Sequence, residues 1–205
     1  LDVTDRSADA KAVRPYLQRL ADGLAPGMDL PPGMHVVVHW SDEDAPNAFA
    51  TLGGHVVVTR GLYARMPSEN ALAMVVAHEI AHVRERDPIS AVGGSATLVL
   101  VLVLLGGDVD RLGPYLAQAV QLGYSRRAER RADALALQAV TEKYGHAGGT
   151  AAVFEVLEQY AGPARSATPT LLSTHPADEE RIARLRDAAR AWDPRTLLRT
   201  SGAHR

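Results

Sequence analysis

The sequence predicts an α+β fold that is mainly helical and contains a small sheet of about three strands. Two β-branched triplets, Val36–Val38 and Val56–Val58, are typical of strands, and the Gly53-Gly54 pair before the second triplet favours a hairpin turn. From Ser68 onward, apolar residues recur at the three- and four-residue steps of amphipathic helices. Strands early in a chain and helices late in it are typical of the α+β class.

The first third of the chain supplies an N-terminal helix and the sheet. Apolar residues at helical spacing predict a helix over Ala8–Leu24, although Pro15 weakens the signal. The Pro31-Pro32-Gly33 run ends this region. The remaining strand is expected at Ala48–Leu52, directly before the glycine pair.

Five helices are expected after the sheet. Ser68 is a suitable N-cap for the first of them, and Pro88 ends it. The other four are expected over Ser95–Leu105, Pro114–Val140, Thr150–Tyr160 and Pro176–Trp192.

Composition limits the class of protein. A chain of 205 residues, 46% of them hydrophobic, suffices for one domain over residues 1–205, which we expect to comprise a helical segment over 1–30 and a core over 35–192. The net charge of -2 gives no general attraction for phosphate backbones, so nucleic acid is excluded as a partner. The lack of cysteine excludes thiolate metal sites, cysteine nucleophiles and disulfides.

Two segments indicate whether the chain carries a signal peptide or a membrane-spanning helix. Leu1–Arg6 has neither the basic nor the apolar region of a signal peptide, so we expect any signal or anchor to have been removed. The apolar stretch Ala96–Leu105 is shorter than the about 20 residues that a membrane-spanning helix needs. A buried core helix is the preferred interpretation; the alternatives are a hydrophobic flap over the active-site side, or a surface that touches a membrane or a partner.

The chemistry is expected at His78-Glu79-Ile80-Ala81-His82. On a helix, residues four apart are separated by about 40° around the axis and about 6 Å along it, so both imidazoles reach one tetrahedral metal ion. Glu79 then lies beside the open coordination position, where its carboxylate takes a proton from water. The flanking residues are apolar, and unpaired imidazoles on so buried a helix would be costly.

A third ligand is sought in the helix that follows. Glu129 and Asp133 share one face of it, so Glu129 is the candidate third metal ligand and Asp133 the acceptor for the outer N–H of a ligand histidine. The alternative is a solvated lattice of ion pairs with the neighbouring arginines Arg126, Arg127, Arg130 and Arg131.

Five segments occur in order along the chain: Asn47–Ala50, Gly54–Leu62, His78–His82, Ser125–Asp133 and Ser173–Pro176. Together these motifs resemble a known family, the zinc metallopeptidases that include the CAAX prenyl endopeptidases and the HtpX-like heat-shock proteases. The resemblance covers residues 35–190, and it looks closest to the soluble periplasmic or lipoprotein branch.

The resemblance implies a gluzincin with a zincin-type fold. One Zn²⁺ ion would be held by His78, His82 and Glu129, with Glu79 as general base, and unfolded or damaged proteins of the cell envelope would be cleaved internally. The chain departs from the integral-membrane members in lacking their spanning helices. It also lacks the repeat extension of some periplasmic relatives.

Two other functions remain open on the sequence. A gluzincin aminopeptidase would need a pocket for a free α-amino group, and the chain shows no Gly-rich exopeptidase signature. A binding module with a structural zinc ion would have no use for Glu79 as a base.

Substrate contacts are expected from two further places. Asn47, Ala48, Phe49 and Ala50 are expected at the edge of the sheet facing the metal, where a polypeptide substrate binds as an added strand. For Phe49, a core position in an ordinary hairpin is an equal alternative. His175, before Pro176 at a helix start, is expected near the zinc, as a donor to the developing oxyanion or as a fourth ligand that closes the site; the alternative is a helix-capping or surface histidine. No functional role is assigned to His35, His39, His55, His146 or His204.

Overall fold

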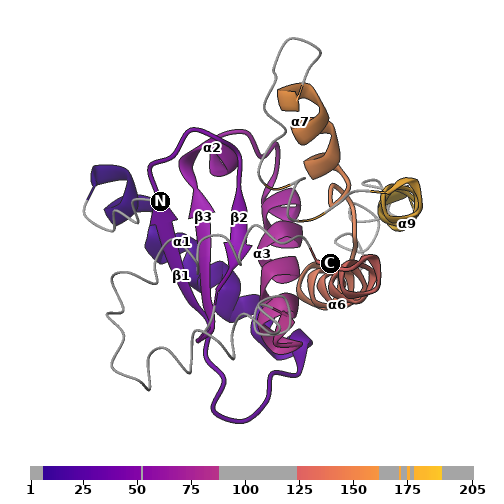
Figure 1. Ribbon diagram of the computed structural model, residues 1–205, viewed down its shortest axis with the longest axis horizontal. Coiled ribbons are helices and arrows are strands. Elements are labelled where there is room, and N and C mark those ends of the chain that lie inside the picture. The colour runs from indigo at the N-terminus through magenta and orange to yellow at the C-terminus, as the bar shows by residue number, and fades with distance from the viewer. Residues whose placement is uncertain are drawn as a thin grey trace, which may run out of the picture.

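The computed structural model describes residues 7–51, 53–87, 124–161, 171, 175 and 178–190. Figure 1 shows a small sheet with helix α1 (Ala8–Leu24) across one face and helix α3 (Glu69–Arg84) beside strand β2. Helices α6 (Arg126–Tyr144), α7 (Ala152–Ala161) and α9 (Glu179–Arg190) lie on the far side of α3 from the sheet. The α+β prediction, mainly helical with about three strands, is confirmed.

The sheet contains β1 (Val37–Ser41), β2 (Ala48–Ala50) and β3 (His55–Thr59) in the order β1-β3-β2. Strands β1 and β3 are parallel, while β2 and β3 form the predicted antiparallel hairpin. The turn needs glycine at Gly54, since its φ is +86° and a Cβ there would lie 2.1 Å from the carbonyl oxygen of His35. Strand β2 is therefore at an edge of the sheet, held in register by a tight turn.

Helix α1 covers the core face of the sheet and protects its other edge. The Gln18 side chain accepts from Val38 N (2.8 Å) and donates to Val36 O (3.0 Å), while Arg14 Nε donates to Val38 O (3.1 Å). These bonds satisfy backbone groups of β1 that have no strand partner on that side. Pro15 is accommodated inside the helix.

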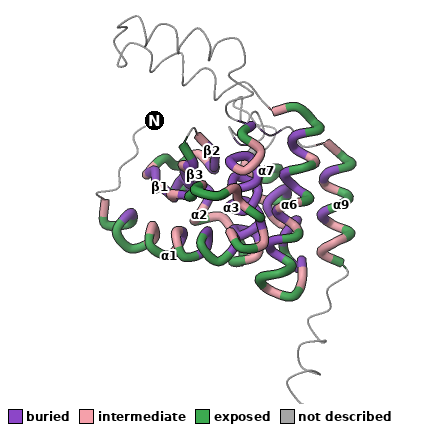
Figure 2. The backbone as a smooth tube through the Cα atoms, turned by 90° about the horizontal axis from the view of Figure 1, so that it is seen from below, coloured by how far each residue is buried: buried purple, intermediate pink, exposed green. Residues whose placement is uncertain are grey.

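Helix α3 begins as predicted, because Ser68 Oγ accepts from Ala71 N at 3.2 Å. Every residue from Ala71 to Val83 is buried, and Figure 2 shows α3 at the centre of the molecule. The helix ends at Arg84, before the predicted Pro88, and Arg86 adopts a φ of +56°. The chain therefore leaves the helix just after the second histidine of the motif.

Helix α6 corrects the prediction of one helix over Pro114–Val140. It begins at Arg126, because Ser125 is extended and its Oγ accepts from Ala128 N at 3.2 Å; Tyr124 also lies outside the helix. It extends to Tyr144, where Gly145 has a φ of +75°. Residues 114–123 lie outside the described residues.

Helices α7 and α9 are close to their predicted ranges. Two short helices were not predicted: the 3₁₀ turn η1 (Ala25–Met28) and α2 (Arg60–Tyr63), which Thr59 Oγ1 caps through Leu62 N. Both are single turns, too short to show a helical period. The predicted Ser95–Leu105 helix lies outside the described residues, as do the expected helix start at Pro176 and the end at Trp192.

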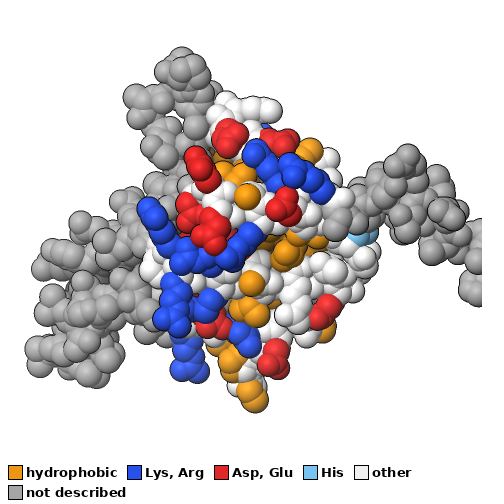
Figure 3. Space-filling view, turned by 90° about the vertical axis from the view of Figure 1, so that its right-hand side faces the viewer, with side chains coloured by type: hydrophobic (Ala, Val, Ile, Leu, Met, Phe, Trp, Pro, Cys, Tyr) orange, Lys and Arg blue, Asp and Glu red, His pale blue; other side chains and the backbone are white. Residues whose placement is uncertain are grey.

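The helices and the sheet enclose one hydrophobic core, and charged side chains lie on the surface. The hydrophobic core joins residues of α1, the sheet, α3, α6, α7 and α9. Figure 3 shows the face where α6 and α9 lie, with basic and acidic side chains intermixed, and ion pairs such as Arg184 with Glu180 (2.6 Å) and Arg190 with Asp187 (3.1 Å) occur there. Of the helices described, none combines the length and the apolar character needed to cross a membrane.

Candidate metal centre

The two motif histidines face each other from successive turns of α3. His78 Nε2 and His82 Nε2 are 3.0 Å apart, and both side chains are buried. The helical repeat places them on one face, and the burial of α3 removes them from water. Two imidazole nitrogens therefore converge on one point in the interior.

Glu129 reaches the same point from the first turn of α6, which packs along α3. Its Oε2 lies 3.3 Å from His78 Nε2 and its Oε1 lies 3.3 Å from His82 Nε2. The carboxylate has no exposed surface. Because Ser125 starts α6 one turn earlier, the helix presents Glu129 to the histidines.

His175 completes the cluster. Its Nδ1 lies 3.2 Å from His78 Nε2 and 3.1 Å from Glu129 Oε1, and the residue is buried. The interpretation of His175 as a surface histidine is wrong, because the side chain is buried against the cluster.

The four side chains fit a zinc ion. Donor atoms of His78, His82, Glu129 and His175 all lie within 4.8 Å of one another. A tetrahedral ion with ligand bonds of about 2.0 Å separates neighbouring donors by about 3.3 Å, and the distances above are 3.0 to 3.3 Å. Three nitrogens and one carboxylate form a donor set typical of zinc sites.

Carboxylates hold the outer nitrogens of both motif histidines. His78 Nδ1 lies 2.9 Å from Asp133 Oδ1, and His82 Nδ1 lies 2.9 Å from Asp87 Oδ2. When Nδ1 donates its proton to a carboxylate, Nε2 keeps the lone pair that binds a metal. The sequence placed Asp133 in this role but missed Asp87, which follows the end of α3 and whose proximity to His82 depends on how the chain leaves the helix.

Arg181 of α9 connects the carboxylates. Its Nε and Nη2 donate to Asp133 at 2.6 and 2.9 Å, and its Nη1 lies 2.7 Å from Glu129 Oε2. Sequence analysis missed Arg181, since nothing in the pattern of an arginine-rich helix distinguishes this arginine from its neighbours. The proposed lattice of ion pairs with the arginines of α6 is not formed: Glu129 and Asp133 contact histidines and Arg181 instead.

Tyr124 was also missed, and it lies against the cluster. Its ring stacks on His82 with the centroids 4.0 Å apart and an interplanar angle of 17°. The contact depends on the extended backbone before α6, which the predicted continuous helix did not allow. Tyr124 therefore restricts the rotation of a candidate ligand ring.

The site holds its carboxylates ionised. Burial opposes the charge on Glu129, but hydrogen bonds with His175, His78 and His82 outweigh it and lower its pKa well below the usual range. Burial likewise opposes ionisation of Asp133, and the hydrogen bonds from Arg181 and His78 hold its pKa at about 2. For His78, burial disfavours the charge while bonds to Asp133 and Glu129 raise the pKa to about 10. The buried carboxylates therefore favour positive charge at the centre of the cluster.

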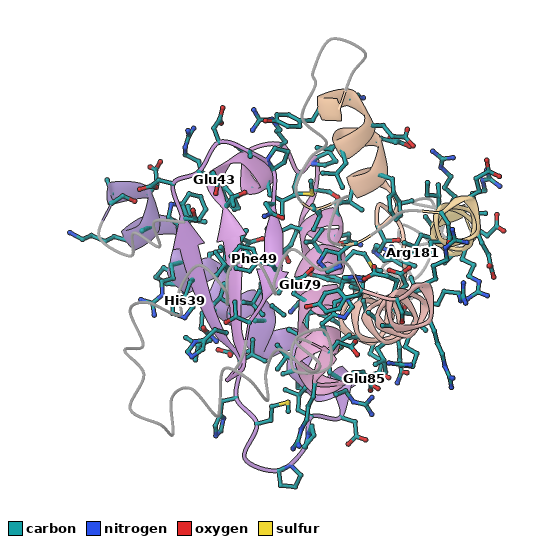
Figure 4. All side chains as sticks on the ribbon, viewed as in Figure 1. His39, Glu43, Phe49, Glu79, Glu85 and Arg181 are labelled. Carbon is teal, nitrogen blue, oxygen red and sulfur yellow. The ribbon has the colours of Figure 1, made fainter. Side chains whose placement is uncertain are left out.

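Glu79 differs from these carboxylates. It is fully buried, yet neither of its oxygens has a hydrogen-bond partner among the described residues. His175 Nε2 lies 3.4 Å from Glu79 Oε1. In Figure 4 Glu79 lies between Phe49 on β2 and Arg181. A buried carboxylate without donors is costly, and such groups are typical of reaction centres.

The expected substrate strand is at the edge of the sheet beside α3, but it is not open. Asn47, Ala48, Phe49 and Ala50 are all buried. Thr59 N donates to Asn47 O and Thr51 N to His55 O, so the intervening Ala48 and Ala50 direct their backbone groups away from β3. The side-chain oxygen of Asn47 is buried without a hydrogen-bond partner among the described residues.

Residues 11–189 match the model of Peptidase family M48. The putative beta-barrel assembly-enhancing protease of Vibrio cholerae is 30% identical over 168 residues, which cover 74% of this chain and 34% of that protein. The protease HtpX homologs of Salinibacter ruber and Dictyoglomus thermophilum are 29% and 30% identical, covering 88% and 87% of this chain and 76% and 71% of those proteins.

The chain thus spans about a third of the Vibrio cholerae protein and most of the HtpX homologs. The family match covers most of α1, the whole sheet, and the helices that contribute to the cluster, α3 and α6. The chain belongs to peptidase family M48 and is a zinc-dependent metallopeptidase.

Proposed function

We propose that the chain is a metalloendopeptidase that cleaves misfolded or damaged proteins of the cell envelope. The observation that carries the proposal is the convergence of His78, His82 and Glu129 on one point, with the unpartnered carboxylate of Glu79 beside it. We assign these first three side chains as the protein ligands of one zinc ion. Zinc, when bound, supplies a Lewis acid that activates water and polarises the scissile carbonyl.

Glu79 is assigned as the general base. Its carboxylate has no competing donor among the described residues, so it is available to accept a proton. As the water oxygen attacks the carbonyl carbon, Glu79 takes a proton from the water. The C–N bond then breaks, and Glu79 gives that proton to the leaving nitrogen; once the new carboxylic acid passes its remaining proton to this amine, the products are a carboxylate and an ammonium group.

Asp133, Asp87 and Arg181 are assigned as positioning residues. Asp133 and Asp87 hold the outer nitrogens of His78 and His82, which fixes the tautomer that binds metal. Arg181 fixes Asp133 through two donors. These contacts are worth most when zinc binds, because a ligand held in one orientation loses less entropy.

His175 has two proposed roles, and each is supported by the position of one of its ring nitrogens. Its Nδ1 lies beside the assigned ligands, which supports a fourth ligand that closes the site. Its Nε2 faces Glu79, which supports a donor to the oxyanion after a small rotation. The two roles predict opposite effects of removing the side chain.

The substrate is proposed to bind as an extended strand along Asn47–Ala50. The support is the register of β2, which aims the N–H and C=O groups of Ala48 and Ala50 at the side where an added strand would pair. Backbone pairing depends little on sequence, which suits cleavage of unfolded chains.

The cell envelope is proposed as the location because one relative is named a putative beta-barrel assembly-enhancing protease. Peripheral membrane contact through Ala96–Leu105 is a further part of the proposal, and it concerns residues outside the described ones. If this segment touches a membrane, co-sedimentation with anionic liposomes should be lost in a folded Leu100→Asp variant. Equal partition of both forms would contradict the contact.

The direct test of the proposed function is cleavage of denatured casein by the purified chain. We expect internal cuts, loss of activity with a chelator, and recovery when one equivalent of zinc is added. Release of single N-terminal residues only would show an aminopeptidase instead. Full zinc occupancy with no cleavage of any unfolded protein would point to a binding module.

A further inference from the structure

Two histidines meet on the sheet, away from the proposed zinc site. His39 lies on β1 and His55 is the first residue of β3, and His39 Nε2 is 2.9 Å from His55 Nδ1. Their ring centroids are 5.0 Å apart, with an interplanar angle of 49°. In Figure 4 His39 lies beside β1, whereas Glu79 lies on the side of the sheet where α3 packs. The two histidines therefore form a separate pair.

The register of the sheet brings the two rings together. Strands β1 and β3 are parallel, and His39 is opposite Val57 while His55 is opposite Val37. The imidazoles are therefore diagonal neighbours on one face of the sheet. The next residue along β1, Val38, belongs to the hydrophobic core on the other face. Because both strands are hydrogen-bonded along this length, the spacing of the pair is set by the sheet and not by a loop.

The spacing suits two ligands of one metal ion. Two nitrogens 2.9 Å apart, each with a bond of about 2.0 Å to the ion, subtend an angle of about 93°. This angle is close to that between neighbouring ligands of a square-planar or tetragonal ion. Nitrogen and oxygen ligands in that geometry are typical of Cu²⁺ and Ni²⁺, and Cu²⁺ binds a given nitrogen site more strongly than the other divalent ions of its row.

The number of ligands also favours copper over a structural zinc ion. Among the described residues, no third histidine and no carboxylate side chain joins the pair within 4.8 Å. A structural zinc site takes four protein ligands, so the pair does not form one. Both histidines are only half-buried, so water can complete the coordination of an ion held by two imidazoles.

We propose that His39 and His55 form a second metal site, which takes Cu²⁺ and, more weakly, Ni²⁺. The ion binds His39 Nε2 and His55 Nδ1 and so links β1 to β3. Without the ion, one of these two nitrogens donates its proton to the other. Ion binding therefore requires that ring to move its proton to its outer nitrogen. The inference does not rest on the proposed endopeptidase function, because it involves neither the zinc ligands nor Glu79.

The test is a titration of the zinc-loaded chain, without a histidine tag, with Cu²⁺. Metal analysis should find one zinc and one copper ion per chain, and electron paramagnetic resonance should show copper bound by two nitrogens. His39→Gln and His55→Gln should each lower the affinity for copper at least about tenfold, because one protein ligand remains of two. The matched control is His146→Gln, at another half-buried histidine, which should bind copper like the parent.

Thermal unfolding gives a second measurement. An ion that binds only the folded chain stabilises it, so Cu²⁺ at 100 times its Kd should raise the Tm of the zinc-loaded parent by about 5–10 °C. The Tm of His55→Gln should not change at the same copper concentration. Circular dichroism of each variant establishes that the fold is retained, and if His39→Gln does not fold, His55→Gln alone decides.

Three results would overturn the second metal site. One is a parent chain that binds no copper beyond what replaces its zinc. Another is copper affinity in His55→Gln equal to that of the parent. The third is an equal rise in Tm with copper for the parent and His55→Gln. Any of these would show that His39 and His55 share a hydrogen bond and no ion, and each would leave the proposed function intact.

Discussion

The buried donors at the centre of the molecule are costly to assemble without a cation. Three imidazoles and Glu129 come together with their nitrogens and oxygens 3.0 to 3.3 Å apart. Asp133 and Asp87 hold two of these rings from behind. These side chains are therefore explained by binding of a cation and not by packing of the core.

Zinc content tests the ligand assignment at the level of single residues. His78→Ala, His82→Ala and Glu129→Ala should each lose most of the bound zinc, because two protein ligands remain of three. Asp44→Ala, at an exposed surface carboxylate, is the control that should keep one zinc per chain. Metal analysis at equal purity gives the answer. Full occupancy in Glu129→Ala would show that the third ligand is another residue.

The rate of His175→Ala distinguishes the two roles of His175. A closing ligand competes with the water, so its removal should speed cleavage of an unstructured peptide. If His175 instead donates to the oxyanion, its removal should lower the cleavage rate by about 10² to 10³. Zinc occupancy of the variant is measured alongside. A change of less than about threefold would contradict both roles.

Some residues of the site could be predicted from the sequence, and others could not. The histidine motif, Glu129 and Asp133 lie at fixed helical spacings, which sequence shows directly. Asp87 follows the end of α3, and Tyr124 precedes the start of α6. Arg181 comes from α9, which is distant in the sequence. Their contacts are set by tertiary packing, and no local period reports them.

Secondary structure was predictable where local chemistry and packing agree. Helix α3 has a serine cap and an apolar interior, and β2 and β3 flank a glycine turn. Helix α6 was predicted too long at its start because a run of helix-compatible residues hid the cap at Ser125. Capping by one hydroxyl outweighed average propensity there.

Strand β2 provides a prediction about substrate affinity. Ala48→Pro removes an N–H that points away from β3, so the ladder with β3 keeps its bonds while an added strand loses one. The apparent KM for an unfolded peptide should rise severalfold with little change in kcat. Phe49→Pro is the contrasting variant, since its N–H lies within the ladder, and it should lower stability instead.

Binding along β2 can also be tested by changing the peptide substrate instead of the protein. Methylation of single backbone nitrogens in a peptide substrate should raise KM at alternate positions only, as strand pairing requires. An unchanged KM in folded Ala48→Pro, together with no dependence on peptide methylation, would contradict binding along β2.

Zinc should also stabilise the whole molecule, because its ligands come from α3 and α6 and their support comes from α9. Zinc at 100 times its Kd adds about 2.7 kcal/mol, which for a chain of this size raises Tm by about 5–10 °C. Thermal unfolding with zinc and with a chelator measures this. His78→Ala should show no difference between the two conditions, and a parent Tm that ignores the chelator would contradict a site that joins these helices.

The most direct test of the account is casein cleavage by Glu79→Gln at verified zinc occupancy. Glutamine is nearly isosteric with Glu79 and is not an assigned ligand, so the variant should keep one zinc ion and the parent's fold. It cannot accept the proton of the attacking water, and the rate should fall by orders of magnitude. Cleavage at near the parent rate by a zinc-loaded Glu79→Gln chain would contradict the assignment of Glu79 as the base.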